Sequence, residues 1–418
     1  MLMEILAEQL YGGKGHGWRI AESWYDQVQQ QLVVRLDPTR EMAFCSCCGA
    51  ACRHPLDTKN WARSWRHRDA WGVRTIVVAP LRRVRCGRCG IRVEKVPWAD
   101  VGARLTRHLE EEVLDRARET SIQGVCRQLG LHWTTVMRLV ERWVRKLTEN
   151  NFRRPLRRIG VDEVSYGRGQ RKYLTIVWDH DRGQVVWIGT GREEATLAAF
   201  FAKLGQRRAQ ALVCVTMDMA AGYIAAVRQH APQADIVFDR FPIERHLLDA
   251  VDEVRKQEFW RQCGRCRDVI RGKKYLLLQR RSRLHWRRRR ELDELLRLNK
   301  RMNAAYVLKE QFAKVWEAHD EHEMATEIER WRRMLRWKRL EPLQHFWRML
   351  VRHEQGVLAW ARHRITNAAL EGNNARVRAL SHRAHGYRNP DHLIVILYHA
   401  SWRRPHALPH SATHPNAR

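Results

Sequence analysis

Three acidic residues of the chain occupy positions where carboxylates can share divalent cations. Asp162 and Asp218 each close a strand-like run, and Glu371 lies in a stretch with helical character. Acids at the ends of strands face water from a rigid sheet, so they can bind metal ions without being buried unpaired. Each acid alone is a weak signal, because acids end strands in many α/β proteins. Asp179 and Asp239 also end strand-like runs and are rival positions.

Carboxylates in this arrangement predict metal-dependent phosphodiester chemistry. Asp162, Asp218 and Glu371 would each bind Mg²⁺ or Mn²⁺ through oxygen. Two ions roughly 4 Å apart can stabilise both the attacking and the leaving oxygen of an in-line displacement. The nucleophile would be water first and then a 3′-hydroxyl group of DNA.

The elements that must position the first two acids follow one another after Pro155. Three strands are predicted first, and two crossover units of helix and strand come next. The predicted strands and helices span residues 159–163, 172–179, 184–189, 193–204, 211–218, 221–230 and 235–239. Three antiparallel-type strands followed by crossover units make a mixed sheet covered by helices, which is the order of an RNase H-like α/β domain. In that order the first and fourth strands are neighbours, which favours Asp162 and Asp218 over their rivals.

The helix that carries Glu371 comes late in the chain. The segment between Asp218 and Glu371 is far longer than the segment between Asp162 and Asp218. The excess is a basic and almost wholly helical block, which predicts a large helical insertion in the α/β domain. The arginine-rich runs 280–290 and 331–339 suit a channel that tracks DNA phosphates, and a solvated basic helix face is the alternative.

The composition of the chain predicts a polyanionic partner. The 418 residues carry 77 Lys and Arg against 46 Asp and Glu, a formal net charge of +31, and 18 tryptophans are interleaved with the cations. Arginine binds phosphate bidentately and aromatic faces stack on bases, so nucleic-acid binding is predicted. No apolar run reaches about 18 residues and the N-terminus lacks a secretory signal. We therefore expect no membrane segment and a bacterial, cytoplasmic and nucleoid-associated protein.

Paired cysteines near the N-terminus predict a structural metal site. Cys45 and Cys48 form one C-x-x-C turn, and Cys86 and Cys89 form the other. Two such turns supply the four thiolates of a tetrahedral Zn²⁺ site, which leaves no open position for catalysis. The segment between the turns exceeds the usual spacing of roughly 15–20 residues, so it must carry a hairpin of its own. The less favoured ligands are Cys47, Cys52, His54 and His67.

A third C-x-x-C pair, Cys263 and Cys266, has no matching pair nearby. We interpret it as free thiols in a basic helical region, with a second metal site as the alternative. Metal binding rather than disulfide formation is the expected use of the N-terminal cysteines, because the chain has no export signal.

A helix-turn-helix is predicted between the cysteines and the α/β segment. A short amphipathic helix at 121–129 leads to a turn at Gly130, where two helices can meet at a corner, and a second helix begins at Trp133. The residues expected to face the major groove of DNA are Trp133, Thr134, Thr135 and Arg138. An ordinary corner between helices is the alternative, and the net charge favours DNA binding.

In chain order, these features predict a multidomain protein. The predicted segments are an N-terminal zinc-binding β-rich domain (1–100), a helix-turn-helix DNA-binding domain (101–150), the first part of an RNase H-like catalytic domain (155–245), a basic helical insertion (246–360), the last part of the catalytic domain (361–402) and a disordered tail (403–418). The tail is rich in proline and histidine, which is typical of disorder.

One motif near the C-terminus resembles a known family. Asn367-x-x-x-Glu371-Gly372-x-Asn374, followed by the segment 385–389, resembles the C-terminal block of insertion-sequence transposases of the ISL3 family. The resemblance runs in the same order through most of the chain. The further segments that carry it are 65–69, 81–86 and 96–99, which resemble the family's zinc-binding region, and 161–163 and 216–219, which match its first two acid motifs.

The resemblance implies a DDE transposase with Asp162, Asp218 and Glu371 as its acids. Such an enzyme binds the terminal inverted repeats of its element, cleaves there and transfers the strands into target DNA. Two ends must be brought together, so a homodimer is expected on DNA. The rival interpretations are a non-catalytic, sequence-specific DNA-binding regulator derived from a transposase and a nuclease that acts on host DNA.

One departure from the family pattern is visible. After Asp239, Arg240 and Phe241 the family usually carries histidine, but Pro242 stands there and His246 follows one helical turn later. This puts a DNA-positioning role of that histidine in doubt. Asn367 and Asn374 of the C-terminal motif are expected to orient Glu371 or the end of its helix rather than to bind metal.

Overall fold

The chain divides into two compact units, Met1–Trp143 and Val144–Arg418, and the division falls within helix α4 (Trp133–Asn151). The computed structural model describes residues 7, 10, 17–39, 42–53, 55–57, 62–152, 154–167, 172–384, 387 and 389–401. Among these described residues, no helix is both long and apolar enough to cross a membrane.

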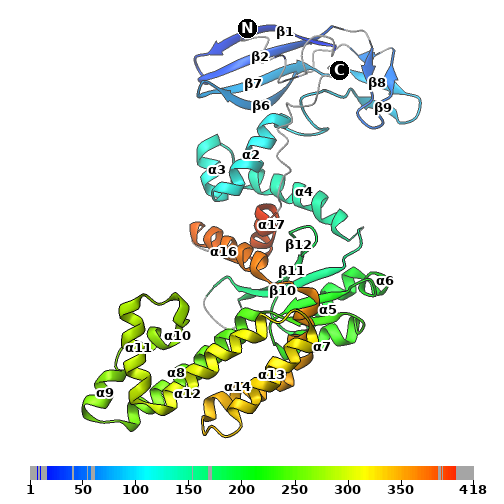
Figure 1. The fold of residues 1–418 in the computed structure, drawn as a ribbon. Helices are drawn as coiled ribbons and strands as arrows, with labels where there is room; N and C mark the ends of the chain where they lie inside the picture. The colour runs from blue at the N-terminus through cyan, green and yellow to red at the C-terminus, as the bar shows by residue number, and fades with distance from the viewer. Residues whose placement is uncertain are drawn as a thin grey trace, which may run out of the picture. The chain divides into compact units, whose positions relative to one another are not determined.

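The N-terminal unit is built on a four-stranded sheet with the order β1-β2-β7-β6 (Figure 1). Its strands are β1 (Trp18–Asp26), β2 (Gln31–Pro38), β6 (Ala62–Ala70) and β7 (Val73–Pro80). Two antiparallel hairpins are joined by parallel pairing of β2 with β7. Alternate side chains of the strands enter a core in which the rings of Trp65 and Trp98 meet edge to face at 5.5 Å.

Two small sheets carry the paired cysteines. β3 (Ala43–Phe44) pairs with β4 (Ala51–Cys52), and β8 (Arg83–Cys86) pairs with β5 (Pro55–Asp57) and β9 (Gly90–Val93). The hairpin predicted between the two C-x-x-C turns is present as β6 and β7. A buried ion pair, in which Arg82 donates to Glu94 over 2.8 and 3.0 Å, joins the start of β8 to the residue that follows β9.

Three helices follow in the order expected for a helix-turn-helix. They are α2 (Arg107–Glu119), α3 (Ile122–Leu129) and α4. Helix α3 begins because the Ser121 hydroxyl accepts a hydrogen bond from the backbone N–H of Gly124 at 3.1 Å. It ends at Gly130, whose φ of 61° lies in the left-handed region that glycine adopts without strain. The predicted glycine corner is therefore confirmed.

The C-terminal unit contains a five-stranded mixed sheet with the order β12-β11-β10-β13-β14. Its strands are β10 (Arg158–Ser165), β11 (Tyr173–Asp179), β12 (Gln184–Thr190), β13 (Cys214–Met217) and β14 (Asp235–Phe238). The first three strands pair antiparallel, whereas β13 is parallel to both β10 and β14. The predicted neighbourhood of the first and fourth strands is confirmed.

Two strands differ from their predicted bounds. β10 does not end at Asp162, because its antiparallel pairing with β11 continues to Ser165 opposite Tyr173. β13 begins only at Cys214, because Val213 instead donates its N–H to the carbonyl of Arg157 at 2.7 Å. Asp162 therefore lies inside β10. The paired residues of β10 and β13 end at Gly160 and Thr216, so Asp162 lies beyond this pairing.

Helices cover both faces of this sheet (Figure 1). One face packs against α5 (Glu194–Leu204) and α7 (Ala221–His230), through side chains such as Phe200 and Val227. The short α6 (Gln206–Ala209) follows α5. The opposite face packs against α16 (Ala368–Arg383) and α17 (Pro390–Ser401), through side chains such as Leu370 and Leu397.

The helical block between β14 and α16 has two cores. Five of its helices share one continuous core with the sheet, namely α8 (Arg240–Arg261), α12 (Lys300–Phe312), α13 (Glu321–Leu335), α14 (Glu341–Arg352) and α15 (Glu354–His363). The helices α9 (Gly264–Ile270), α10 (Lys274–Leu278) and α11 (Trp286–Leu298) surround a smaller core, to which α12 also contributes Met302 and Tyr306. The predicted insertion boundaries at 245 and 360 fall inside α8 and α15, and the expected disordered tail lies outside the described residues.

Gly356 of α15 offers a test of this packing. A Cβ atom there would clash with the Phe238 ring and would lie 3.1 Å from the carbonyl oxygen of Ile236. We expect Gly356→Ala to destabilise the C-terminal unit by about 1–3 kcal/mol, because β14 and α15 would have to separate. Gly372→Ala is the matched control, because no atom lies within 4 Å of its added Cβ. Chemical denaturation of the two variants checks this, and equal midpoints would contradict it.

Candidate functional site

The three predicted acids line one cavity of about 710 Å³ in the C-terminal unit. Its lining includes five carboxylates, two guanidinium groups and one imidazole. These charged or titratable residues are Asp162, Glu163, Asp218, Asp249, Glu371, Arg245, Arg378 and His246. An acid-rich cavity is an exception in a chain with a net charge of +31. The arrangement suits a cation better than an anion.

The sheet and α16 supply the three acids from three different elements. Asp162 lies on β10 and Asp218 follows β13, where the two strands pair in parallel up to Gly160 opposite Thr216. Two residues further along each strand, the same register sets Asp162 beside Asp218. Glu371 lies in the first turn of α16, which packs on the face of the sheet beside β10.

The electrostatics of the cavity resist the ionisation of its acids. Burial raises the pKa of Asp162 to about 6, and the carboxylates of Asp218 and Glu371 push it in the same direction. The pKa of Glu163 and that of Glu371 are also raised, in both cases first by burial. A bound cation would relieve the repulsion among these carboxylates, so the residues present fit a divalent metal.

The acids surround the cavity without closing on one point. Among the described residues, four cysteines form the one group of three or more Cys, His, Asp or Glu that is close enough to hold a metal ion as it stands. The carboxylates of Asp162, Asp218 and Glu371 do not form such a group. They share a cavity wide enough for cations and a phosphodiester to lie among them.

Asn374 positions the first acid. Its side-chain amide donates to Asp162 Oδ2 at 2.6 Å, and the backbone N–H of Glu163 donates to Asp162 Oδ1 at 2.8 Å. Asn374 is almost fully buried, with 1% of its surface exposed, so the rotamer of this amide is held by packing. The hydrogen bonds of Asn374 therefore orient Asp162, whereas the sequence suggested Glu371 or the helix end.

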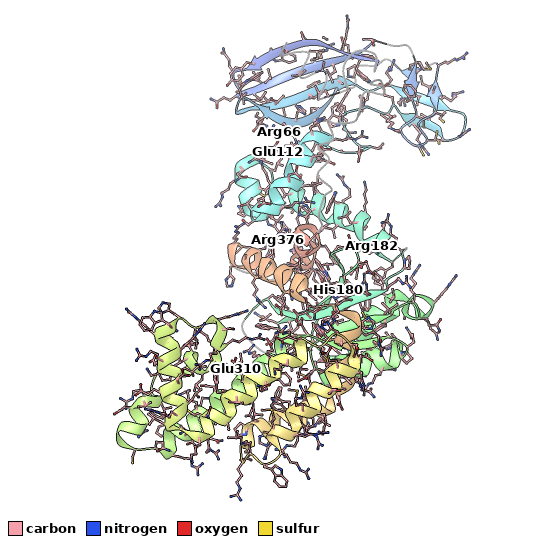
Figure 2. The ribbon with its side chains drawn as sticks, in the orientation of Figure 1. Arg66, Glu112, His180, Arg182, Glu310 and Arg376 are labelled. Atoms are coloured by element: carbon pink, nitrogen blue, oxygen red, sulfur yellow. The ribbon has the colours of Figure 1, made fainter. Side chains whose placement is uncertain are left out.

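A buried chain of hydrogen bonds holds the start of α16 against the sheet. The Thr216 hydroxyl donates to Asn367 Oδ1 at 2.5 Å, so its oxygen is left to accept from His180 Nε2 at 2.6 Å. His180, which follows β11 (Figure 2), is kept neutral because burial lowers its pKa to about 4. Gly160 of β10 lies over this chain, and a Cβ there would come within 2.8 Å of both Asn367 and His180.

The rival acids serve the fold. Asp239 accepts from the backbone N–H of Phe241 at 3.2 Å and from that of Asn367 at 2.7 Å, so it begins α8 and holds the start of α16. Asp179 accepts from backbone groups of the following turn and from the Arg182 guanidinium at 3.0 Å. Neither lines the cavity, and none of the contacts that hold them was visible in the sequence pattern.

The position where the sequence departs from the family pattern borders the same cavity. Pro242 and His246 both line it, from successive turns of α8. The histidine is therefore displaced along the helix but still faces the cavity. The sequence put a role of this histidine in doubt, and the structure places His246 in the lining of the cavity.

The four predicted zinc ligands lie together in the N-terminal unit. The sulfur atoms of Cys45, Cys48, Cys86 and Cys89 all lie within 4.8 Å of one another. Backbone N–H groups of the two turns point at the sulfurs, and they are the first cause of the lowered pKa of Cys45 and of Cys86, the latter to about 6. Thiolates held by backbone N–H groups are what a structural zinc site requires, so the cluster is compatible with zinc.

The less favoured ligands lie outside this cluster. His67 is buried against Thr106, with Nδ1 and Oγ1 2.8 Å apart, and burial lowers its pKa to about 3. Cys52 donates to the carbonyl of Ala50, and Cys47 is exposed. His54 lies outside the described residues. Of the third pair, Cys263 is an exposed thiol, and the side chain of Cys266 is not among those described.

The predicted DNA-reading residues lie on the first two turns of α4. Thr134, Thr135 and Arg138 are exposed and Trp133 is half-buried, whereas Val136 and Val140 of the same helix are buried. One face of α4 thus enters the core and the other is open to a ligand, as in a recognition helix. Half-burial gives Trp133 a part in the packing as well.

The helix-turn-helix is that of a DNA-binding protein, and the C-terminal unit adds an acid-lined cavity. Residues 159–397 match the ISL3 transposase family, and residues 94–144 match the helix-turn-helix domain of the same family. The transposase for insertion sequence element IS1001 of Bordetella parapertussis is 30% identical over 399 residues, which cover 94% of this chain and 97% of the relative. The transposase for insertion sequence element IS1557 of Mycobacterium tuberculosis is 30% identical over 415 residues, which cover 92% of each. The chain belongs to the ISL3 family of transposases.

The raised pKa of Asp162 predicts a gain in stability from the change Asp162→Asn. Its pKa of about 6 in the folded chain exceeds the ordinary 3.8, so the folded state binds the proton more tightly and ionisation at higher pH opposes folding. Without divalent cation at pH 8, we expect the variant to be about 1–3 kcal/mol more stable than the wild type. Denaturation as a function of pH checks this.

The gain should shrink as the pH is lowered from about 6 toward the ordinary pKa of 3.8, because the wild-type carboxyl becomes protonated. Added Mg²⁺ should also shrink it, by stabilising the wild type alone. A variant that is no more stable than the wild type at pH 8 would show that Asp162 carries no such penalty.

The cysteine cluster predicts that each chain holds one Zn²⁺. Cys86→Ser should remove the metal and lower the unfolding midpoint of the N-terminal unit, because a structural zinc site contributes directly to folding. Metal analysis of the purified protein and thermal denaturation check both effects. Cys47→Ser is the control and should keep its zinc, since the Cys47 thiol lies outside the cluster. Full zinc content in Cys86→Ser would rule out the assignment.

Proposed function

We propose that the chain binds the ends of an insertion sequence and catalyses DNA cleavage and strand transfer by a DDE mechanism. The observation that carries the proposal is the acid-rich cavity beside β10 and the end of β13, which Asp162, Asp218 and Glu371 all line in a chain that is otherwise basic. The strand order β12-β11-β10-β13-β14 around it supports an RNase H-like domain. Membership of a transposase family supports the same chemistry.

Asp162, Asp218 and Glu371 would hold Mg²⁺ or Mn²⁺ in this proposal. Two such ions, when bound, supply Lewis-acid stabilisation of the attacking and leaving oxygens of a phosphodiester. The residues themselves set the geometry. Asn374 fixes the carboxylate of Asp162, and the hydrogen bonds around Asn367 fix the helix that carries Glu371.

The basic residues of the cavity have a complementary role. Arg245 and His246 on α8 and Arg378 on α16 line the same cavity as the acids. Guanidinium groups bind the non-bridging oxygens of phosphate and hold the phosphorus in line with the attacking oxygen. Arg378 lies near enough to Glu371 to lower its pKa against the effect of burial. In this proposal the arginines bind the phosphate directly, and the acids bind it through the cations that they hold.

The N-terminal unit would supply the recognition of DNA. In the proposal, Thr134, Thr135 and Arg138 contact base edges in the terminal inverted repeats, and Trp133 sets the position of their helix. The zinc cluster stabilises the domain that precedes this helix. Transposition joins two ends, so we propose a homodimer on DNA, and a place of action at the bacterial nucleoid.

A conservative change at each acid tests the catalytic assignment. Asp162→Asn, Asp218→Asn and Glu371→Gln should each reduce cleavage of a duplex that carries the element's end by about 10²–10³-fold or more, because each removes a carboxylate from the cavity. Binding of the same duplex should be retained. A gel assay of cleavage and of strand joining, alongside a binding assay, separates these quantities. Asp249→Asn, at another acid of the cavity, is the control and should lose less than about tenfold.

The rival interpretations predict other results. A non-catalytic regulator would show the same activities in Glu371→Gln as in the wild type. A nuclease that acts on host DNA would cleave without joining the cut strands to a target. Wild-type activity in any of the three acid variants would remove that residue from the mechanism.

A further inference from the structure

A cluster of large apolar side chains is exposed at one end of the helical block. Trp337 in the turn after α13 is 81% exposed, Trp260 near the end of α8 is 74% exposed and Leu298 at the end of α11 is 54% exposed. Exposed apolar side chains of this size at neighbouring helix ends suggest a binding site. We call these three residues the tryptophan tip.

Ion pairs and hydrogen bonds bring the three segments of the tip together. Glu258, two residues before Trp260, pairs with Arg301 at 2.8 Å and accepts from Asn299 at 2.9 Å. Arg301 in turn donates to the carbonyl of Arg339, two residues after Trp337, at 2.8 Å. Leu298 immediately precedes Asn299. Glu258 and Arg301 therefore hold the end of α8, the start of α12 and the turn after α13 together, and the three exposed side chains of the tip lie at or beside these helix ends.

Cations without partners surround the tip. Among the described residues, no hydrogen bond or ion pair is recorded for the side chains of Arg297, Lys300, Lys338 and Arg339. Arginines also lie over the two exposed rings, Arg267 over Trp260 at 4.8 Å and Arg336 over Trp337 at 5.0 Å from the ring centroids. Other exposed arginines of the block do have acidic partners, such as Arg332 with Glu329. The tip is therefore both apolar and strongly positive.

We propose that the tryptophan tip binds duplex DNA at a fixed distance from the acid-lined cavity. The unpaired cations would hold phosphates, and the two tryptophan rings would pack against sugars and bases in a groove, as apolar wedges do. A second copy of the chain is a poorer occupant, because a symmetric contact through this patch would set like charges against each other. This inference rests on the proposed function only in placing the cleaved bond at the cavity.

Helix α8 sets the distance. Phe241 in its first turn lines the acid cavity, and Trp260 lies in its last turn. An α-helix rises about 1.5 Å per residue, so these two residues are roughly 28 Å apart along the axis. Duplex DNA rises about 3.4 Å per base pair, so the tip would meet the duplex roughly eight base pairs from the cleaved bond.

Equilibrium binding of end-containing duplexes tests the proposal. We expect Trp337→Ala to weaken binding of a long duplex by about five- to fiftyfold with little change in its salt dependence, because an apolar contact is lost. Lys338→Ala should weaken binding and lower the slope of log K against log salt by about one. Tyr275→Ala is the control, since Tyr275 is 69% exposed on α10, outside the tip, and its loss should leave binding unchanged.

Truncation of the DNA locates the contact. Two shortened duplexes are used, each ending roughly four base pairs from the cleavage site, one on either side of it. One of them should lack the tip's contact, so the wild type and Trp337→Ala should bind it equally. Equal losses in Trp337→Ala and Tyr275→Ala, or no effect of either truncation, would overturn the proposal. Unchanged DNA affinity with altered sedimentation of Trp337→Ala would make the tip a protein interface. These measurements need no cleavage, so failure of the catalytic assignment would be seen separately, as binding without cutting.

Discussion

Glu371 lines the same cavity as the two strand acids because a buried set of hydrogen bonds fixes where its helix begins. Asn367 is the residue that precedes α16. Its side chain accepts a hydrogen bond from Thr216, and its backbone N–H donates to Asp239. Thr216 is hydrogen-bonded in turn to His180. These groups lie where the absence of a side chain at Gly160 leaves room. A buried polar network is stable only when its members are paired, so it selects one position of α16 rather than many. One helical turn later, Glu371 reaches the cavity.

The helical block packs against the same sheet. This explains how a long insertion can separate Asp218 from Glu371 in the sequence while both residues keep fixed positions. Helices α8 and α12–α15 share their apolar core with β10, β13 and β14, and Gly356 lets α15 approach β14 closely. Because α8 begins at the Asp239 cap beside the cavity and ends at the tryptophan tip, it connects two surfaces of opposite charge through a single rigid element. Among the described residues, the smaller core around α9–α11 includes none from the sheet.

The strand order, the helix-turn-helix and the cysteine cluster could all be predicted from the sequence, because they rest on local periodicity, on glycine at a corner and on fixed ligand spacing. The choice of Asp162 and Asp218 over Asp179 and Asp239 also followed from strand order. The hydrogen bond from Asn374 to Asp162 could not be predicted, since it joins residues far apart in the chain through a helix register. The extension of β10 to Ser165 was missed because it depends on pairing with β11 rather than on apolar alternation.

The contrast between a basic chain and its acidic cavity has a thermodynamic consequence. The carboxylates that resist their own ionisation also repel the phosphate that the surrounding arginines attract. A cation and a phosphodiester bound there would each remove a repulsion felt by the other, so their binding would be cooperative. Linkage makes such coupling reciprocal: whatever factor the cation adds to DNA affinity, DNA adds to cation affinity. Charge placement alone would thus make the protein acquire its metal mainly when DNA is already in position.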